Sequence, residues 1–474
     1  MNAAASAAVL TPEQWRERVK ACLREVEELV ERPPRLQTAA DLEALEREFA
    51  RDCDALCSSA IGAVAQAALN SDVVKEKARD LADSTSKRLK PADVRTVYVQ
   101  FQRGPRVPLS TQYYRRRKGD ILRREKGLFP AFTLLGIQER ASPGATSQIA
   151  RAACAMSSLE EAAACLRDTG GLDVDVKTIR RITRRFGQRA RSALPDHLRI
   201  MTPNGEGRTL VISVDGGRLR VRRDTRGPPT RKGRRRYHTD WREPLLLHVY
   251  VLNPDGSVDR SFSPLIDGTL GGADALFDML RLYLPSLLSI QPTRVVLIAD
   301  GAPWIWARFE ALVKDGCLAG AGQVLQLIDF YHAVQHLGAF AQAYPGWHSA
   351  CRTRWRNKAR SLLRKGKIGK VLADMQRLVG RHPRNKALKR EMRYFVNNGG
   401  RFSYAWARRL RVSIGSGPME SAVRRVINMR LKGPGIFWHE DTAETMIMIR
   451  AYYKAQRWHE IERLGYSAPV EALL

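Results

Sequence analysis

The sequence predicts an α/β protein whose mixed sheet has an antiparallel first part, a helical insertion in the sheet domain, and mainly helical regions before it. Three observations lead to this prediction: the order of strand and helix patterns after residue 205, apolar runs that end in aspartate, and excess positive charge. The 474 residues include 80 Lys and Arg against 49 Asp and Glu, a formal net charge of +31. Such an excess favours nucleic acid as the partner, and the length predicts two to four domains.

Residues 1–92 have a helical pattern. LTPEQWRERVKACLREVEELVER opens with a Thr N-cap and a Pro in the first turn, and DLEALEREFARDCDALCSSAIGAVAQAAL predicts a second helix. The region suits a helical scaffold, a dimer arm or a DNA-contacting element equally well.

Residues 93–144 predict a basic β-hairpin. VRTVYVQFQR alternates as a strand does, and VPLSTQYYRRR resembles its partner strand. The basic end of this hairpin suits a nucleic-acid backbone or a solvated surface.

Residues 145–200 predict a helix-turn-helix-like DNA-binding domain. Its second helix begins at a predicted capping box from Ser157 to Glu160, and a Gly-Gly turn precedes its last helix. In VKTIRRITRRFG the residues Ile179, Ile182 and Phe186 share one face, and the other face presents four candidate DNA-binding residues: Arg180, Arg181, Arg184 and Arg185.

Residues 205–340 predict the first part of a catalytic core. Three strand patterns (TLVISVDGGRLRVR, EPLLLHVYVLNPDGSV and RSFSPLIDGTL) are followed by helix, strand, helix, strand and helix, which is the order of the RNase H-like fold. That fold places carboxylates at the ends of its first and fourth strands, where Asp215 and Asp300 stand. Asp329 ends the next strand pattern, in QVLQLIDFYHAVQHL.

Residues 341–412 predict the helical insertion, and residues 413–474 the last part of the core. In GSGPMESAVRRVINMRLKGPGIFW, Pro418 opens a helix and Glu420 lies in its first turn, where a glutamate also suits the helix dipole alone. The candidate DNA-binding residues that follow are Arg424, Arg425, Arg430 and Lys432.

Together, VDGG, IADGAPWIW, DFYHAVQHL and GSGPMES resemble the motifs of DDE transposases of bacterial insertion sequences, closest to the Kra-four group and more distantly to Mutator and hAT transposases. The resemblance implies a metal-binding catalytic triad of Asp215, Asp300 and Glu420, with Asp329 and His332 as accessory residues. It implies Mg²⁺ as cofactor, for which Mn²⁺ can substitute, and in-line phosphoryl transfer that cleaves element ends and joins them to target DNA. The expected partners are double-stranded DNA and further copies of the chain, in a homodimer or higher assembly. The zinc-ligand cysteines that many relatives carry before a segment like GLFPAFTLLG are absent here, so no zinc finger is expected.

The run RLRVRRDTRGPPTRKGRRR (218–236) holds ten basic residues in nineteen. Its Gly-Pro-Pro centre predicts a flexible loop that clamps DNA across the metal site. Its candidate DNA-binding residues are Arg218, Arg220, Arg222, Arg223, Arg234, Arg235 and Arg236. Trp304, Trp306 and the tryptophans of the insertion suit base stacking or core packing.

The sequence also disfavours several classes of protein. It has no GxxxxGK[ST] motif for nucleotide hydrolysis and no apolar run long enough for a membrane span, and its seven cysteines form no CxxC pair. With no convincing signal peptide, we expect a cytoplasmic, nucleoid-associated bacterial protein. Two alternatives stay open: an RNase H-like nuclease without transposition, and a catalytically dead, transposon-derived DNA-binding protein.

Overall fold

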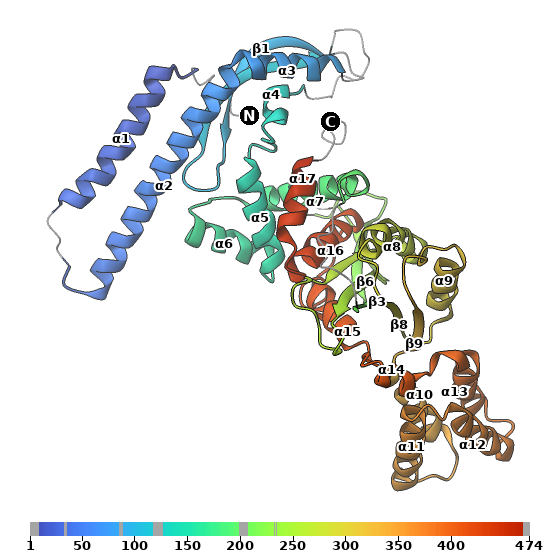
Figure 1. Ribbon diagram of the computed structural model, residues 1–474. Helices are drawn as coiled ribbons and strands as arrows, with labels where there is room; N and C mark the ends of the chain where they lie inside the picture. The colour runs from blue at the N-terminus through green and yellow to red at the C-terminus, as the bar shows by residue number, and fades with distance from the viewer. Residues whose placement is uncertain are drawn as a thin grey trace. The chain divides into compact units, whose positions relative to one another are not determined.

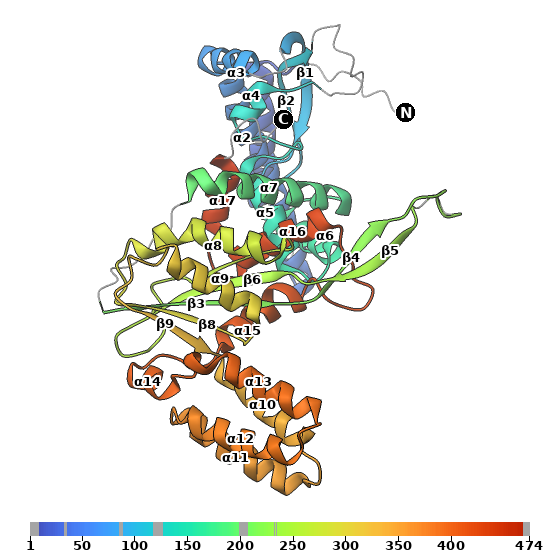
Figure 2. The same ribbon diagram turned by 90° about the vertical axis from the view of Figure 1, so that its right-hand side faces the viewer.

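The structure is a computed structural model that describes residues 9–32, 36–84, 89–116, 127–198, 207–231, 233 and 235–467. The chain forms two compact units, one of residues 1–197 and 459–474 and one of residues 198–458 (Figures 1 and 2). None of the described helices is long and apolar enough to cross a membrane.

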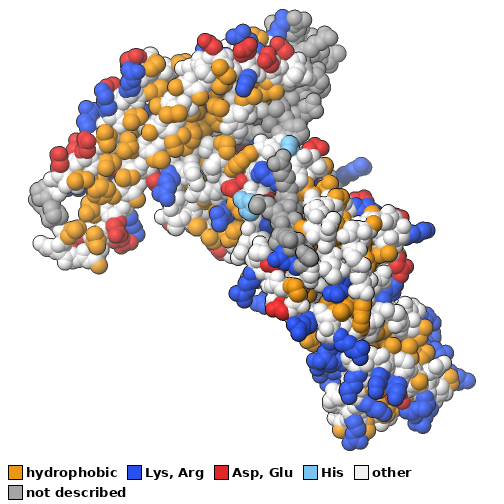
Figure 3. Space-filling model, in the orientation of Figure 1, with side chains coloured by type: hydrophobic (Ala, Val, Ile, Leu, Met, Phe, Trp, Pro, Cys, Tyr) orange, Lys and Arg blue, Asp and Glu red, His pale blue; other side chains and the backbone are white. Residues whose placement is uncertain are grey.

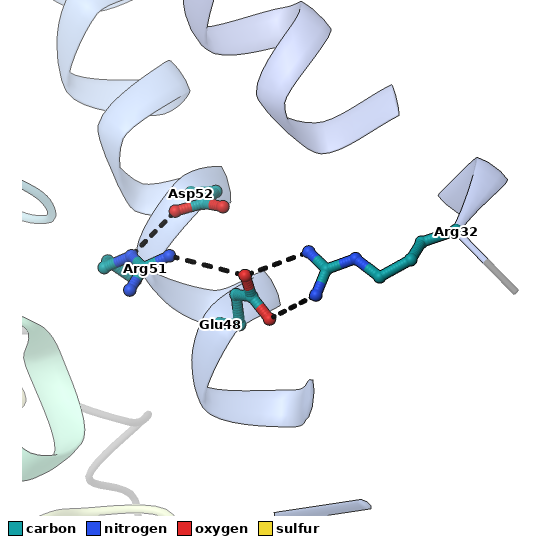
Figure 4. Close-up of polar contacts among 4 residues, drawn as sticks. All are labelled: Arg32, Glu48, Arg51 and Asp52. Atoms are coloured by element: carbon teal, nitrogen blue, oxygen red, sulfur yellow. Dashed lines mark hydrogen bonds and ion pairs between the residues drawn. The ribbon is translucent and has the colours of Figure 1, made fainter. Parts of the chain in front are cut away.

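The first unit begins with the two predicted helices, α1 (Pro12–Glu31) and α2 (Ala39–Asn70), and a third helix, α3 (Asp72–Ser84), which was not predicted separately from them. Thr11 caps α1 through a capping box with Gln14. Figure 4 shows how the end of α1 is tied to α2: the Arg32 guanidinium donates to both carboxylate oxygens of Glu48, at 3.4 and 3.1 Å. Arg51 pairs with the neighbouring Asp52 at 2.8 Å.

The predicted hairpin is confirmed as the antiparallel strands β1 (Leu89–Val99) and β2 (Val107–Arg116), followed by the short helix α4 (Pro130–Leu134). Gln66 of α2 fixes β2, because its side chain accepts from the Ser110 N–H at 2.7 Å and donates to the Ser110 carbonyl at 2.9 Å. Residues 117–126, which continue the basic end of the hairpin, lie outside the described residues.

The three helices predicted for residues 145–200 are α5 (Pro143–Ala155), α6 (Leu159–Gly170) and α7 (Val176–His197). The predicted Ser157–Glu160 cap is wrong by one residue. Ser158 is the extended N-cap residue, and its hydroxyl accepts from the Glu161 N–H at 3.0 Å. In the last helix, α17 (Trp458–Ser467), the residues from His459 onward belong to this first unit and not to the core part expected for 413–474.

The second unit contains a five-stranded mixed sheet in the order β7-β6-β3-β8-β9. Its strands are β3 (Thr209–Gly216), β6 (Leu245–Leu252), β7 (Leu265–Thr269), β8 (Arg294–Ala299) and β9 (Val324–Ile328). β6 is antiparallel to both of its neighbours, β3 and β7, whereas β8 runs parallel to both β3 and β9. Helices α8 (Gly272–Leu288) and α16 (Glu440–Lys454) pack against the β6–β7 side, and α9 (Pro303–Lys314) connects β8 to β9. The prediction of an α/β fold with a mixed sheet is therefore confirmed.

One strand prediction is wrong. The pattern TLVISVDGGRLRVR is divided at Gly216 and Gly217, and its second half forms β4 (Leu219–Asp224), which leaves the main sheet. β4 pairs with β5 (Tyr237–Arg242) as a separate antiparallel two-stranded sheet, here named the β4–β5 ribbon (Figure 2).

The insertion consists of α11 (Ser349–Arg364), α12 (Ile368–Arg381), α13 (Lys386–Asn397) and α14 (Tyr404–Arg409), and α10 (Phe330–Ala343) packs against α11 and α13. Lys and Arg side chains gather on the surface of these helices (Figure 3). Residues 341–412 contain twenty Lys and Arg, against only Asp374 and Glu391.

Candidate active site

Asp215 and Asp300 lie at the same edge of the sheet. In the register of the parallel strands β3 and β8, Ser213 lies beside Ile298. Asp215 and Asp300 each lie two residues after this pair, so they also lie next to each other. Asp300 is fixed by the start of α9: its carboxylate accepts from the Ala302 N–H at 2.9 Å, and its carbonyl accepts from the Trp306 indole at 2.6 Å. Parallel strands that end side by side therefore bring the two predicted carboxylates together.

Glu420 lies in the first turn of α15 (Gly417–Val423), as predicted, and Pro418 lies at the start of that helix. α15 packs against β3 and β6, which places the helix beside the strand that carries Asp215. Burial raises the pKa of Asp215 to about 6. The Gly216 N–H and His332 act against this rise, whereas the nearby charges of Asp300 and Glu420 add to it. Asp300 and Glu420 therefore both act electrostatically on Asp215.

Asp329 and His332 both lie at this edge but have different roles. Asp329 caps α10, since one carboxylate oxygen accepts from the His332 N–H at 2.8 Å. Its other oxygen accepts from the Ser416 N–H, and from the Ser416 hydroxyl at 2.5 Å. Asp329 thus fixes the turn that leads into the Glu420 helix, whereas His332 interacts with Asp215.

The donor chemistry of the site suits a divalent cation. Carboxylate oxygens are the ligands that Mg²⁺ prefers. A bound cation would favour the charged form of Asp215, which burial and, to a smaller extent, the charges of Asp300 and Glu420 disfavour. In the part of the chain that the structure describes, no group of three His, Cys, Asp or Glu side chains forms a metal-binding cluster.

Tyr394, which the sequence identified only as one of several aromatic residues of the insertion, packs against the end of β8. A Cβ at Gly301, the residue after Asp300, would lie 2.1 Å from the Tyr394 ring. The Tyr394 ring stacks on His336 at 3.6 Å, and His336 Nδ1 lies 2.7 Å from the buried Glu391 carboxylate. Burial raises the pKa of Tyr394, and the charges of Asp300 and Asp329 add to the rise. The glycine after Asp300 was the one signal in the sequence for this close approach.

The four arginines predicted for the recognition helix lie on the solvent side of α7, exposed or half-buried, while Ile179, Ile182 and Phe186 are buried. Two of the four are paired within the first unit. Arg181 lies 2.6 Å from Glu139, and Arg185 pairs with the same carboxylate.

The basic segment 218–236 is more ordered than predicted, because residues 219–224 form a strand. Arg220, Arg222 and Arg223 lie on β4, Arg218 precedes it, and Arg235 and Arg236 precede β5, whereas Arg234 lies outside the described residues. The backbone of Trp438 holds β4 in place through two hydrogen bonds. The Trp438 N–H donates to the Arg220 carbonyl at 3.0 Å, and the Trp438 carbonyl accepts from the Arg222 N–H at 2.7 Å. The ribbon is therefore attached to the segment that follows the Glu420 helix.

After α15 the chain forms a π-helical turn, Arg424–Asn428. Arg424 and Lys432 are exposed and Arg425 is half-buried. Arg430 is only 4% exposed and packs over the Trp438 ring at 5.1 Å, so the expectation that it contacts DNA is wrong. Trp306 is likewise buried, which makes it a core residue and not a base-stacking one.

Comparison with known proteins adds no name to these observations. No protein-family model matches the chain, and no curated protein is significantly similar to it. The functional assignment therefore depends on the residues and their arrangement.

Proposed function

We propose that this protein is a DDE transposase, which cleaves DNA at the ends of a mobile element and joins those ends to target DNA. One observation carries the proposal: Asp215 in β3, Asp300 directly after β8 and Glu420 in α15 are far apart in the sequence, yet the charges of Asp300 and Glu420 both act on Asp215. The strand order β7-β6-β3-β8-β9, with its antiparallel first three strands, supports an RNase H-like core.

Each residue of the site has a separate role in the proposed phosphoryl transfer. Asp215, Asp300 and Glu420 would hold Mg²⁺, or Mn²⁺ in its place, which when bound supplies an activated attacking oxygen and a stabilised leaving oxygen. Asp329 holds the turn before Glu420, and His332 is available to orient a phosphate. In the first step a water oxygen bonds to phosphorus and the bond to the 3′ oxygen breaks. In the second step the released 3′ oxygen bonds to a phosphorus of the target strand, the bond from that phosphorus to the target's own 3′ oxygen breaks, and the leaving 3′ oxygen takes up the proton.

The proposed partner is double-stranded DNA, both element ends and target. The candidate contacts are the arginines of α7 in the first unit, and those of the β4–β5 ribbon and the segment after α15 in the second. A homodimer or higher assembly follows from the need to pair two ends, and a bacterial cytoplasmic location follows from the substrate.

The test is cleavage of labelled DNA that carries the element's own ends, in Mg²⁺ and in EDTA. We expect wild type to nick the ends only with metal and Asp300→Ala to be inactive. Asp278→Ala removes an exposed carboxylate of α8 and should leave cleavage unchanged. Nicking without strand joining would favour the nuclease alternative, and tight binding without cleavage in any protein would favour the dead DNA-binding protein.

A further inference from the structure

The β4–β5 ribbon has two chemically different faces. The register pairs Arg220 with Trp241 and Asp224 with Tyr237, and directly paired residues of antiparallel strands share a face. One face therefore presents Arg220, Arg222 and Asp224 from β4, and Tyr237, Thr239 and Trp241 from β5. The opposite face carries Leu219 and Val221, which are fully buried. The ribbon is thus anchored through the face of Leu219 and Val221. On the other face, here named the Arg–aromatic face, Tyr237 packs beside Phe437 with ring centroids 5.0 Å apart, and Arg222 pairs with Asp224 at 3.2 Å. Trp241 is the most exposed ring of this face.

The aromatic rings on that face are exposed. Trp241 is 59% exposed and Tyr237 is 42% exposed. The Arg222 guanidinium lies over the Tyr237 ring at 4.4 Å, and the Arg220 guanidinium lies 5.7 Å from the Trp241 ring. Exposed rings interleaved with guanidinium groups are the composition of surfaces that bind nucleic-acid strands, where rings stack on bases and cations hold phosphates.

We infer that this Arg–aromatic face binds unpaired DNA strands through base stacking. Along its length a duplex exposes only phosphates and base edges, because its bases are stacked on one another. Aromatic rings can stack only on bases whose flat faces are exposed, as they are in an unpaired strand. Tyr237 and Trp241 are four residues apart on β5, about 14 Å at the usual rise of a strand, which is far enough to stack on different nucleotides.

The attachment of the ribbon places this strand-binding face next to the proposed chemistry. Trp438 hydrogen-bonds the main chain of β4 on both sides of Val221, and the Arg220 side chain donates to the Gly433 carbonyl at 2.8 Å. Both partners lie in the segment that follows α15. The inference rests on the proposed function: the unpaired strand that binds the Arg–aromatic face is the DNA that the carboxylate site would cleave.

The test measures binding alone, in EDTA, with a labelled 20-nucleotide oligo(dT) and a 20-base-pair duplex. We expect Trp241→Ala to weaken oligo(dT) binding about tenfold and duplex binding less than about twofold. Val313→Ala, which trims an apolar side chain of α9 that is 41% exposed and has no proposed role in binding, should change neither affinity. Retained duplex binding also shows that the variant is folded.

A second readout reports stacking directly. Oligo(dT) should quench the tryptophan fluorescence of wild type, and Trp241→Phe should bind with similar affinity but lose a clear part of that quench. Equal losses for oligo(dT) and duplex in Trp241→Ala, or unchanged binding and unchanged quench, would overturn the inference. Because no cleavage is measured, these outcomes are independent of whether the protein is a transposase.

Discussion

The carboxylate of Asp329 accepts two hydrogen bonds from Ser416, one from its backbone N–H and one from its hydroxyl at 2.5 Å. Asp329 follows β9, and Ser416 immediately precedes the helix of Glu420, so one side chain closes the chain around the whole insertion. A neighbouring backbone bond, from the Phe330 N–H to the Ile414 carbonyl at 2.9 Å, strengthens the closure. Glu420 is thereby held against the sheet by a residue that need not bind metal.

Asp329→Asn tests this positioning role. The amide nitrogen cannot accept from Ser416, and hydrogen bonds to a charged group contribute about 1.5–3 kcal/mol each. We expect the free energy of unfolding to fall by about 2 kcal/mol and single-turnover cleavage to fall at least tenfold. Urea denaturation and a cleavage time course measure the two effects.

Ser416→Ala is the matched control, because it removes the hydroxyl bond and keeps the backbone one. Its losses of stability and cleavage should both be smaller than those of Asp329→Asn. Wild-type cleavage by Asp329→Asn would exclude the positioning role.

The raised pKa of Asp215 predicts a pH-dependent stability. Its pKa is about 6 in the folded protein against an ordinary value of 3.8, so between these pH values the folded state binds more protons than the unfolded state. The unfolding free energy therefore falls as pH rises through this window. Above pH 6 the protein has lost all of the stability that a protonated Asp215 provides at low pH. At about 1.4 kcal/mol per pKa unit, Asp215→Asn should stabilise the protein by up to about 3 kcal/mol at pH 7.5 while abolishing cleavage.

Thermal unfolding at pH 4 and pH 7.5 checks this prediction. The stabilisation should fall below about 1 kcal/mol at pH 4, where Asp215 is protonated in the folded protein. Asp278→Asn, which changes an exposed carboxylate of α8, is the control. Mg²⁺ at pH 7.5 should raise the melting temperature of wild type more than that of Asp215→Asn. A variant no more stable than wild type at pH 7.5 would argue against the crowded carboxylate site.

The positions of Asp215 and Asp300 could be predicted from sequence because each follows an apolar run and precedes a glycine, a purely local pattern. The departure of β4 from the sheet could not, since it depends on tertiary contacts: a Cβ at Gly217 would lie 2.7 Å from Ile427, more than 200 residues later. The burial of Arg430 could not be predicted either, since Arg430 follows a π-helical turn at Arg424–Asn428, and such a turn changes which residues of the segment face solvent.

The cap of α6 illustrates a different limit. Ser157 and Ser158 both stand three residues before a glutamate, so the pattern alone could not choose between them. Tyr394 was missed because its contact with Gly301 joins segments about ninety residues apart, and no local pattern reports such packing.

Gly301→Ala tests the contact between the insertion and the end of β8. The added methyl would lie 2.1 Å from the Tyr394 ring, and overpacking of this kind typically costs about 1–3 kcal/mol. We expect a loss of that size in unfolding free energy and slower cleavage, since the displaced segment carries Asp300.

Gly399→Ala is the control, because a Cβ there would meet nothing within 4 Å. Combining Gly301→Ala with Tyr394→Ala should destabilise the protein by less than the sum of the two single changes. Strict additivity would show that the ring and the glycine do not compete for the same space.

Glu139→Gln tests whether α7 contacts DNA. Glu139, whose side chain is only 14% exposed, pairs with Arg181 and Arg185, whose side chains are 49% and 52% exposed. Glutamine has nearly the same size and keeps an oxygen that can accept hydrogen bonds from both guanidinium groups, so the variant should fold. Removing the carboxylate charge leaves the charge of both guanidinium groups available for phosphates. We expect about threefold tighter duplex binding and a steeper dependence of affinity on salt, by up to about one additional released counterion.

Glu160→Gln makes the same change in net charge at an exposed position of α6 and separates a local effect from a general one. Arg180→Gln should act in the opposite direction, with weaker binding and a shallower salt dependence. Equal gains from both glutamate variants would mean that only net charge matters. No change in any of the three would remove α7 from the DNA interface, because a helix that touches phosphates must respond when the charge beside it changes.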